Sequence, residues 1–300
     1  MEIDKKNGLC NYCDKHHAYW VDGNEDDRYI SVTTLISQFH EKFDANFWGR
    51  YKALEAIVDP TIFSMEKKNL LATHKWDDDI LKRYDIDVLT FNTKVNEIID
   101  GYEHEKQIAC DRGTKFHLEQ EQKFYKQTYH ALPQFNLSGE FKCLPNNYEL
   151  KEEKGIYPEF LVSKITKDGI LKLAGQIDLL VKDGNDFLIA DYKTNKEIKQ
   201  KSFYDRAARS TKKMFYPLNN FDDVNYSHYT LQLSTYAWMI EQLNPDYKVK
   251  KLVLIHCDHS DKITTYDLNY VKEDVIRMLG YYKKQRGIEL EHNKTKQINF

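Results

Sequence analysis

Hydrophobic residues fall into short runs along the chain, and the clearest pattern lies within residues 173–198. Two apolar runs there are separated by residues 182–186, where Asp183-Gly184 is typical of a hairpin turn. Strands that are apolar on both faces indicate a buried sheet. The pattern therefore predicts a β-hairpin with one strand through Val181 and a second strand from Phe187 to Tyr192.

The same periodicity predicts the other elements. A small hairpin is expected within residues 18–30, and further strands at 156–164, 251–258 and 263–268. Apolar residues at helical spacing predict helices at 34–57, 106–127, 228–243 and 270–286. The charged segment 60–105 is interpreted as a helical insertion or lid.

Composition limits the class of protein. The chain has 300 residues, of which 41% are hydrophobic and 13% aromatic, enough for one large domain or two small ones. The net charge of −3 does not indicate nucleic-acid binding by the whole surface, so any basic surface must be local. Five cysteines and the absence of a signal peptide predict a reducing, cytoplasmic location. No apolar run approaches the roughly 20 residues that span a bilayer, so no membrane association is expected.

Charged residues interrupt the apolar hairpin. Asp191 and Lys193 point to the same face, because side chains two residues apart in a strand share a face. In a regular hairpin, Asp178 reaches them from the neighbouring strand. Two buried carboxylates repel each other, and a divalent cation such as Mg²⁺ resolves the conflict. Lys193 would then orient a water or stabilise charge on phosphate. The alternative is an edge hairpin with a solvated Asp–Lys pair.

Four polar residues on other elements are candidates for the same site. His117 lies on a predicted helix and can ligate the cation if that helix packs beside the hairpin. Glu159 lies in an apolar strand, either at the site or on a solvent face. Gln232 and Tyr236 are four residues apart and share one helix face, where they could also be merely structural.

Residues 193–213 form the strongest basic segment. It holds eight lysines and arginines, namely Lys193, Lys196, Lys199, Lys201, Arg206, Arg209, Lys212 and Lys213. The segment is either a solvated loop or a groove for a phosphate backbone, with Tyr204, Phe215 and Tyr216 available to stack on bases.

Two N-terminal motifs are less specific. In Ser31-Val-Thr-Thr, Ser31 is a plausible helix N-cap, and the hydroxyl groups including Thr33 could also hold a phosphate. Cys10-x-x-Cys13, followed by His16, is either half of a zinc site or a pair of free thiols.

The order of these motifs resembles a known family. The chain carries, in sequence, Gly113-x-x-x-His117-x-x-x-Glu121, Glu159, Gly175-x-x-Asp178, Asp191-Tyr-Lys193-Thr194 and Gln232-x-x-x-Tyr236. Together they resemble the RecB-like exonuclease branch of the PD-(D/E)xK nuclease superfamily. The Ser31 motif, DYKT and LQLSTY most resemble the group that contains the mitochondrial genome maintenance exonuclease and its phage relatives. The resemblance covers residues 18–285, with 60–105 unmatched.

The resemblance implies an α/β fold with a restriction-endonuclease-like core, in which helices flank a mixed central sheet. We expect a single nuclease domain over residues 1–300. Within it, residues 18–59 form a hairpin and helix, 60–105 a helical insertion, and 106–285 the catalytic core.

The resemblance also implies roles for individual residues. Mg²⁺ or Mn²⁺ would be held by His117, Asp178, Asp191 and the main-chain carbonyl of Tyr192. Lys193 would position the attacking water, and Glu159 would assist the metal or the substrate. The residues expected to contact DNA are Gln232, Tyr236, Thr194, Lys196, Ser31 and Thr33. Some RecB-like relatives hold an iron–sulfur cluster with three clustered cysteines after the core, but only Cys257 follows Lys193 here, so no cluster is expected.

The resulting hypothesis is a metal-dependent DNA exonuclease that acts on single-stranded ends in replication, recombination or repair. A bacterial or phage-infected cell is the expected setting, with a helicase or recombination protein as a partner. Residues 60–105 and 194–213 would form an arch that threads a free end. The alternatives are a structure-selective endonuclease and a catalytically silent DNA-binding module. The silent module would be expected to lose the lysine or an acid, and all are present.

Overall fold

The computed structural model describes residues 1–126, 141–205 and 210–298, so Arg206 and Arg209 of the basic segment lie outside the described residues. The contacts divide the chain into two compact units. The first comprises Met1–Glu41 and Lys115–Phe300, and the second comprises Lys42–Thr114. Every candidate site residue belongs to the first unit.

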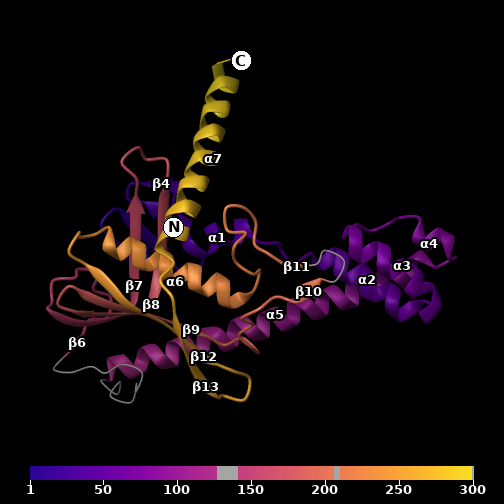
Figure 1. Ribbon diagram of the computed structural model, residues 1–300, viewed down its shortest axis with the longest axis horizontal. Helices are drawn as coiled ribbons and strands as arrows, with labels where there is room; N and C mark the ends of the chain where they lie inside the picture. The colour runs from indigo at the N-terminus through magenta and orange to yellow at the C-terminus, as the bar shows by residue number, and fades with distance from the viewer. Residues whose placement is uncertain (127–140, 206–209, 299–300) are drawn as a thin grey trace. The chain divides into compact units, whose positions relative to one another are not determined.

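A mixed sheet forms the centre of the first unit (Figure 1). In the described part of the chain it has seven strands in the order β13-β12-β9-β8-β7-β6, and β5 also pairs with β8. Strands β7, β8 and β9 are antiparallel neighbours, whereas β9 and β12 run parallel. The strands are β5 (Ile30–Ser31), β6 (Lys142–Cys143), β7 (Lys154–Ile165), β8 (Lys172–Asp183), β9 (Asp186–Lys193), β12 (Lys248–Cys257) and β13 (Ile263–Leu268).

The predicted central hairpin is confirmed. Strands β8 and β9 pair antiparallel from Asp183↔Asp186 to Leu179↔Ala190. The turn places Gly184 at φ +61°, a left-handed conformation that glycine adopts without a steric penalty. The turn chemistry therefore sets the register that brings Asp178 opposite the end of β9.

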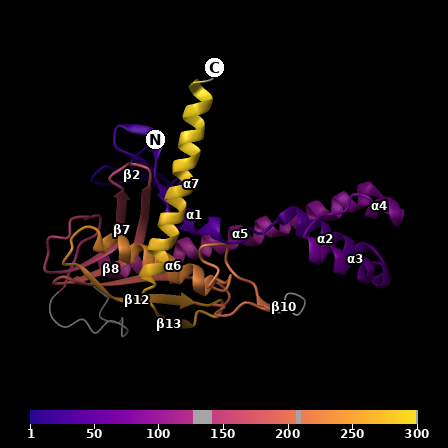
Figure 2. The ribbon, with the colours of Figure 1, turned by 45° about the horizontal axis from the view of Figure 1, so that its top comes forward.

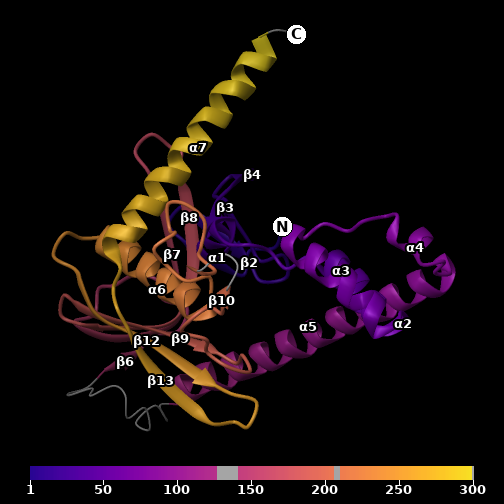
Figure 3. The same ribbon diagram turned by 45° about the vertical axis from the view of Figure 1, so that its right-hand side comes forward.

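Side chains of the strands fill two apolar layers, one on each face of the sheet. On one face, Ile177 and Ile189 pack with α1 (Val32–Ile36), the 3₁₀ turn η1 (Ser37–Phe39), α6 (Asn225–Glu241) and α7 (Lys272–Ile298). Figure 2 shows the N-terminal half of α7 beside α6, and Figure 3 shows α6 beside the sheet near the paired β12 and β13. The other face, with Leu179 and Ala190, packs against Phe124 of α5 (Val88–Tyr125). The predicted α/β fold, with a mixed sheet flanked by helices, is confirmed.

The prediction of one helix over residues 34–57 is wrong. Helix α1 ends at Ile36, η1 ends at Phe39, and His40 is extended with φ −142° and ψ 163°. A new helix, α2 (Ala45–Ile57), begins after Asp44, whose carboxylate accepts a hydrogen bond from the Phe47 amide at 3.0 Å. The apolar residues keep a helical spacing through this region, but the N-cap of α2 starts a new helix within it.

Helices also make up the second unit, which contains the whole of the predicted helical segment 60–105. It contains α2, α3 (Pro60–Thr73), α4 (Ile80–Arg83) and the first part of α5. Its core is formed by buried residues of these helices, including Phe47, Leu54, Leu70, Ile80 and Phe91. Among the described residues, no helix is both long and apolar enough to cross a membrane.

Short strands complete the first unit. The predicted hairpin at 18–30 is confirmed by β3 (Ala18–Val21) and β4 (Asn24–Arg28), which turn at Gly23. Two strands that were not predicted, β1 (Lys5–Asn7) and β2 (Cys10–Cys13), extend it to a four-stranded sheet. Strands β10 (Tyr204–Asp205) and β11 (Ser210–Thr211) pair separately. Cys10 and Cys13 are free thiols, and neither belongs to a metal-competent group among the described residues.

Candidate active site

The β8–β9 hairpin places two acids side by side. Asp178 directly precedes Leu179, the first residue of β8 that pairs with β9, and its Oδ2 accepts a hydrogen bond from the backbone N–H of Tyr192 at 2.7 Å. Asp191 ends the apolar part of β9 and is buried. The carboxylate of Asp178 is therefore held by the backbone of the neighbouring strand.

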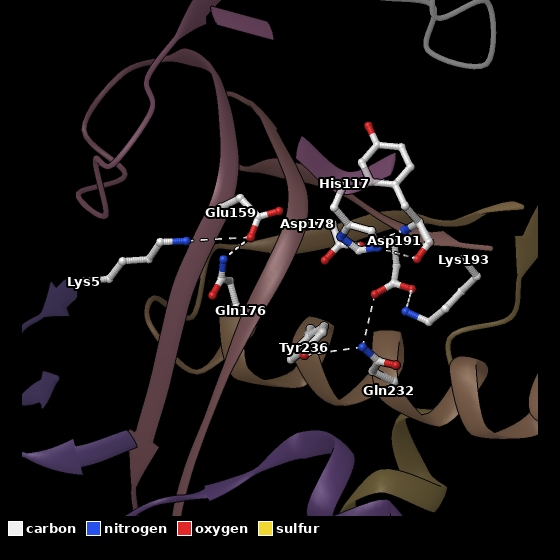
Figure 4. Close-up of polar contacts among 10 residues, drawn as sticks. Lys5, His117, Glu159, Gln176, Asp178, Asp191, Lys193, Gln232 and Tyr236 are labelled. Carbon is white, nitrogen blue, oxygen red and sulfur yellow. Dashed lines mark hydrogen bonds and ion pairs between the residues drawn. The ribbon is translucent and has the colours of Figure 1, made fainter. Parts of the chain in front are cut away.

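Glu159 reaches the same place from β7. The pairs Pro158↔Leu179 and Phe160↔Ile177 put Glu159 opposite Asp178. Its φ of +52° is left-handed, which costs a non-glycine residue about 1–3 kcal/mol and is typical of functional sites. The interpretation of Glu159 as a solvent-face residue is thus wrong, because its side chain is only 17% exposed and faces the cluster (Figure 4).

Two residues hold the Glu159 carboxylate. The side-chain amide of Gln176 donates a hydrogen bond to it. The ammonium of Lys5, on β1, forms an ion pair with it at 3.8 Å. The N-terminal sheet therefore contributes a charge to the site.

His117 completes the cluster from the end of α5 that belongs to the first unit. Its Nε2 lies 3.1 Å from the carbonyl oxygen of Tyr192, and its Nδ1 lies 3.5 Å from Oδ2 of Asp178. The Phe116 ring packs edge-on against the Tyr192 ring, with centroids 5.9 Å apart. His117 was expected to ligate a cation only if its helix packs beside the acidic hairpin, and the helix does pack there.

His117, Glu159 and Asp178 can hold a metal ion together. Each offers one ligand atom, and these atoms lie within 4.8 Å of one another. One imidazole and two carboxylates, with the Tyr192 carbonyl beside His117, match the oxygen-rich ligand set of Mg²⁺ or Mn²⁺.

The carboxylate of Asp191 is not part of that group of three. It forms an ion pair with Lys193, and its Oδ1 accepts a hydrogen bond from Nε2 of Gln232 at 3.1 Å (Figure 4). The ammonium of Lys193 also lies over the ring of Tyr229, 5.0 Å from its centroid. The predicted shared face of Asp191 and Lys193 is present, and it forms the second half of the site.

Burial shifts the ionisation of these groups. It raises the pKa of Glu159 to about 8, with a further increase from Asp178, while Lys5 opposes the shift. Burial also raises the pKa of Asp191 to about 6, against the ammonium of Lys193. For Lys193, burial would lower the pKa, but Asp191 and Asp178 outweigh it and hold the pKa above its usual value. Lys193 is therefore a cation facing a crowded group of acids.

Helix α6 supports the site through Gln232 and Tyr236, which are both buried. Nε2 of Gln232 donates to Asp191 and lies 3.5 Å from the hydroxyl oxygen of Tyr236. The Tyr236 ring lies directly against Gly175 of β8, where an added Cβ would be 2.5 Å from Cε1 of the ring. The glycine in Gly175-x-x-Asp178 thus permits helix and strand to approach closely.

The other predicted DNA contacts lie around the cluster and not within it. Ser31 caps α1, accepting a hydrogen bond from the Thr34 amide at 3.0 Å. Ser31 also pairs with Ala174, four residues before Asp178 along β8. Thr33 and Lys196 are exposed, and Thr194 follows the end of β9.

Three site residues were missed by the sequence analysis. Gln176 lies two residues before Asp178 in the same strand, so strand alternation could have identified it. Tyr229 lies three residues before Gln232 on α6, so helical spacing could have identified it. Lys5 carries no comparable signal, because only the tertiary fold brings β1 to Glu159.

Comparisons with known proteins complete the description. The family model of the PD-(D/E)XK nuclease superfamily matches residues 67–297. No curated protein matches the chain. The crystal structure of SSO0001 is similar at 14% identity over 87% of this chain and 78% of that one, with a TM-score of 0.34. A "putative exonuclease" from Eubacterium rectale is similar at 12% identity over 87% and 80%, with a TM-score of 0.33.

Proposed function

The chain belongs to the PD-(D/E)XK nuclease superfamily, and on that premise we propose that it is a divalent-metal-dependent DNA exonuclease that hydrolyses phosphodiester bonds from single-stranded ends. One observation carries the proposal. The metal-competent group of His117, Glu159 and Asp178 lies beside the ion pair of the buried Asp191 with the partly buried Lys193. A cation site next to a held ammonium provides the charge stabilisation that favours hydrolysis of a phosphodiester.

The proposed metal ligands are His117, Glu159, Asp178 and the main-chain carbonyl of Tyr192. When bound, Mg²⁺ or Mn²⁺ supplies Lewis-acid stabilisation of phosphate charge and lowers the pKa of water. Asp191 remains a proposed further ligand, because each carboxylate oxygen has two lone pairs and its Oδ1 accepts one bond from Gln232.

The chain's own residues would position the reactants. The ammonium of Lys193, held by Asp191 and the Tyr229 ring, would orient the attacking water and stabilise charge on the phosphate. Gln232 would keep the Asp191 carboxylate in place, with Tyr236 behind it. In this proposal Gln232 and Tyr236 act on DNA chiefly by orienting the site near the scissile phosphate.

A path for the DNA strand is proposed along the sheet edge near Ser31. The partner of Ser31 lies four positions before Asp178 in β8, a distance of about 13 Å along the strand. A cavity of about 750 Å³ beside Ser31 is lined by Arg28, Arg286 and Lys172, and Lys172 forms an ion pair with Asp27, which also lines the cavity. Cationic side chains and hydroxyls suit a phosphate backbone, and the exposed Thr33, Thr194 and Lys196 would add contacts.

The resemblance to phage-encoded RecB-like exonucleases extends the proposal to DNA replication, recombination or repair. The cytoplasm of a bacterial or phage-infected cell is the proposed setting. A helicase or recombination protein that exposes single strands is the proposed partner.

The proposal is tested with end-labelled linear DNA and closed circular DNA, both single-stranded, in Mg²⁺, Mn²⁺ or EDTA. We expect metal-dependent loss of the linear strand alone. Lys193→Ala should lower the rate by at least 100-fold, because the charge beside the phosphate is removed. Lys262→Ala, at an exposed lysine in the turn between β12 and β13, is the control and should retain the rate.

Cleavage of the circular strand would contradict exonuclease activity and indicate an endonuclease with the same fold. Retained DNA binding without cleavage in either metal would contradict an active nuclease and favour a DNA-binding module. Equal activity of Lys193→Ala and Lys262→Ala would contradict the assignment of the site.

A further inference from the structure

A second group of metal-competent side chains lies outside the site described above. His40, Asp223 and His228 each offer a ligand atom, and these atoms lie within 4.8 Å of one another. His40 follows η1, Asp223 lies two residues before α6, and His228 is in the first turn of α6. Among the described residues, only this group and the His117 group have that property.

The two imidazoles lie next to each other. Their rings are stacked, with centroids 4.1 Å apart and planes 18° from parallel, so one ring must turn about χ2 before a nitrogen of each faces the same ion. Nδ1 of His40 lies 3.1 Å from the carbonyl oxygen of Glu41. A carbonyl only accepts, so Nδ1 carries the proton and Nε2 keeps a lone pair in the neutral ring. A backbone carbonyl that fixes one ring nitrogen is the usual outer contact of a metal-binding histidine.

The carboxylate of Asp223 is divided between two neighbours. Its Oδ1 accepts a hydrogen bond from Nε2 of His228 at 2.9 Å, a contact that a bound ion would replace, and its Oδ2 lies 3.2 Å from Nζ of Lys212. Lys212 is itself shared with Glu41, at 2.8 Å. Two acids against one lysine leave this cluster with one net negative charge when both imidazoles are neutral. A cation is therefore electrostatically favoured, and Lys212 orients the carboxylate that would bind it.

We propose that His40, Asp223 and His228 form a second metal site, which binds Zn²⁺. Two imidazoles and one carboxylate suit Zn²⁺ and other late first-row ions, whereas Mg²⁺ prefers oxygen ligands. The His117 group has the opposite composition, with two carboxylates and one imidazole. The side chain of His228 is 23% exposed, so solvent can reach the group and a water can complete the coordination.

Zinc at this place would stabilise the start of α6. The N-cap of that helix, Val224, provides no side-chain hydrogen bond. A metal bridging His40 to Asp223 and His228 would join the segment after η1 to the first turn of α6. Gln232 follows His228 by one helical turn, so the site would brace the helix that supports Asp191. This role does not depend on the proposed nuclease activity.

The test uses the full chain carrying His117→Ala, which removes the imidazole of the other group. We expect about one Zn²⁺ per chain after equilibrium dialysis against a buffered micromolar Zn²⁺ solution, and a Zn²⁺-dependent rise in Tm. Adding His40→Phe should weaken Zn²⁺ binding by at least 100-fold, because phenylalanine keeps the stacked ring but has no ligand nitrogen. His259→Ala, at an exposed histidine away from the group, should leave the stoichiometry unchanged.

Co²⁺ gives a second readout, since its visible spectrum reports nitrogen ligation directly. A Co²⁺ spectrum that is lost in His40→Phe and kept in His259→Ala supports the site. Absence of bound Zn²⁺ in the His117→Ala chain would overturn the proposal. So would a folded His40→Phe chain that keeps both its Zn²⁺ and its Co²⁺ spectrum. Neither result depends on nuclease activity, so failure of this proposal is distinguishable from failure of the proposed function.

Discussion

Replacing Gly175 by alanine should damage both stability and activity, because this position has no room for a side chain. The new Cβ would lie 2.5 Å from Cε1 of Tyr236 and 3.1 Å from its hydroxyl oxygen. Gly175 and the Tyr236 ring are both buried, so the overlap can be relieved only by moving the ring or the strand. Overpacking of this kind costs about 1–3 kcal/mol. For a chain of this size, that corresponds to a fall in Tm of a few degrees to about 10 °C.

The displacement should also reach the catalytic acids. Tyr236 lies 3.5 Å from Nε2 of Gln232, which in turn donates to Asp191. A hydrogen bond to a charged group contributes about 1.5–3 kcal/mol, so its loss would slow cleavage by about tenfold or more. Gly280→Ala is the control, because no atom lies within 4 Å of the added methyl group, and alanine should stabilise α7 slightly.

A double-mutant cycle separates this contact from a general loss of stability. Tyr236→Leu removes Cε1 of the ring and should relieve the overlap, so the double variant Gly175→Ala/Tyr236→Leu should be more stable than the sum of the single changes. Tyr236→Phe keeps Cε1 and should give no relief. Thermal and urea unfolding measure these differences. Additive effects within about 0.5 kcal/mol for Tyr236→Leu would refute the reasoning.

Two further predictions concern charges at the site. The pKa of Glu159 is about 8 in the folded chain, against an ordinary value of 4.5. Between these two pH values the folded chain binds more protons than the unfolded chain, so in EDTA the free energy of unfolding should fall as the pH rises from about 4.5 to 8. Glu159→Gln should flatten that fall in urea unfolding, and an unchanged slope would contradict the burial of the acid. Tyr229→Leu should lower the cleavage rate by about 3–30-fold through loss of the cation–π contact with Lys193. Tyr229→Phe keeps the ring and should retain most of the rate; equal losses in both variants would argue against a role of the ring.

The sequence identified the parts of the site that depend on local geometry. Asp191 and Lys193 share a face because strand side chains alternate, and the Asp183-Gly184 turn sets the pairing that brings Asp178 beside them. The helix face of Gln232 and Tyr236 follows from helical spacing in the same way. In each case the neighbours are close in sequence or are joined by one tight turn.

Contacts between segments that are far apart in the sequence could not be predicted from strand alternation, helical spacing or turn type. Lys5 meets Glu159 only because the N-terminal strands pack on the main sheet, and nothing local to either residue indicates it. His40 lies in a predicted helix that the structure interrupts, and its stacking on His228 depends on that interruption. Asp44 is a residue type that commonly caps helices, but the prediction followed the apolar spacing alone and did not consider it.

Glu159 shows why the site can be recognised at all. Its left-handed backbone and its buried carboxylate both oppose folding, and each would be costly in an isolated strand. The flanking Tyr157 and Phe160 are fully buried in the apolar layers, so the sheet holds Glu159 in a conformation that it would not adopt alone. The sequence shows one of these two unfavourable features, an acid within an apolar strand. The structure shows the second, the left-handed backbone of the same residue. Both occur opposite Asp178, where a bound cation would favour the ionised acids.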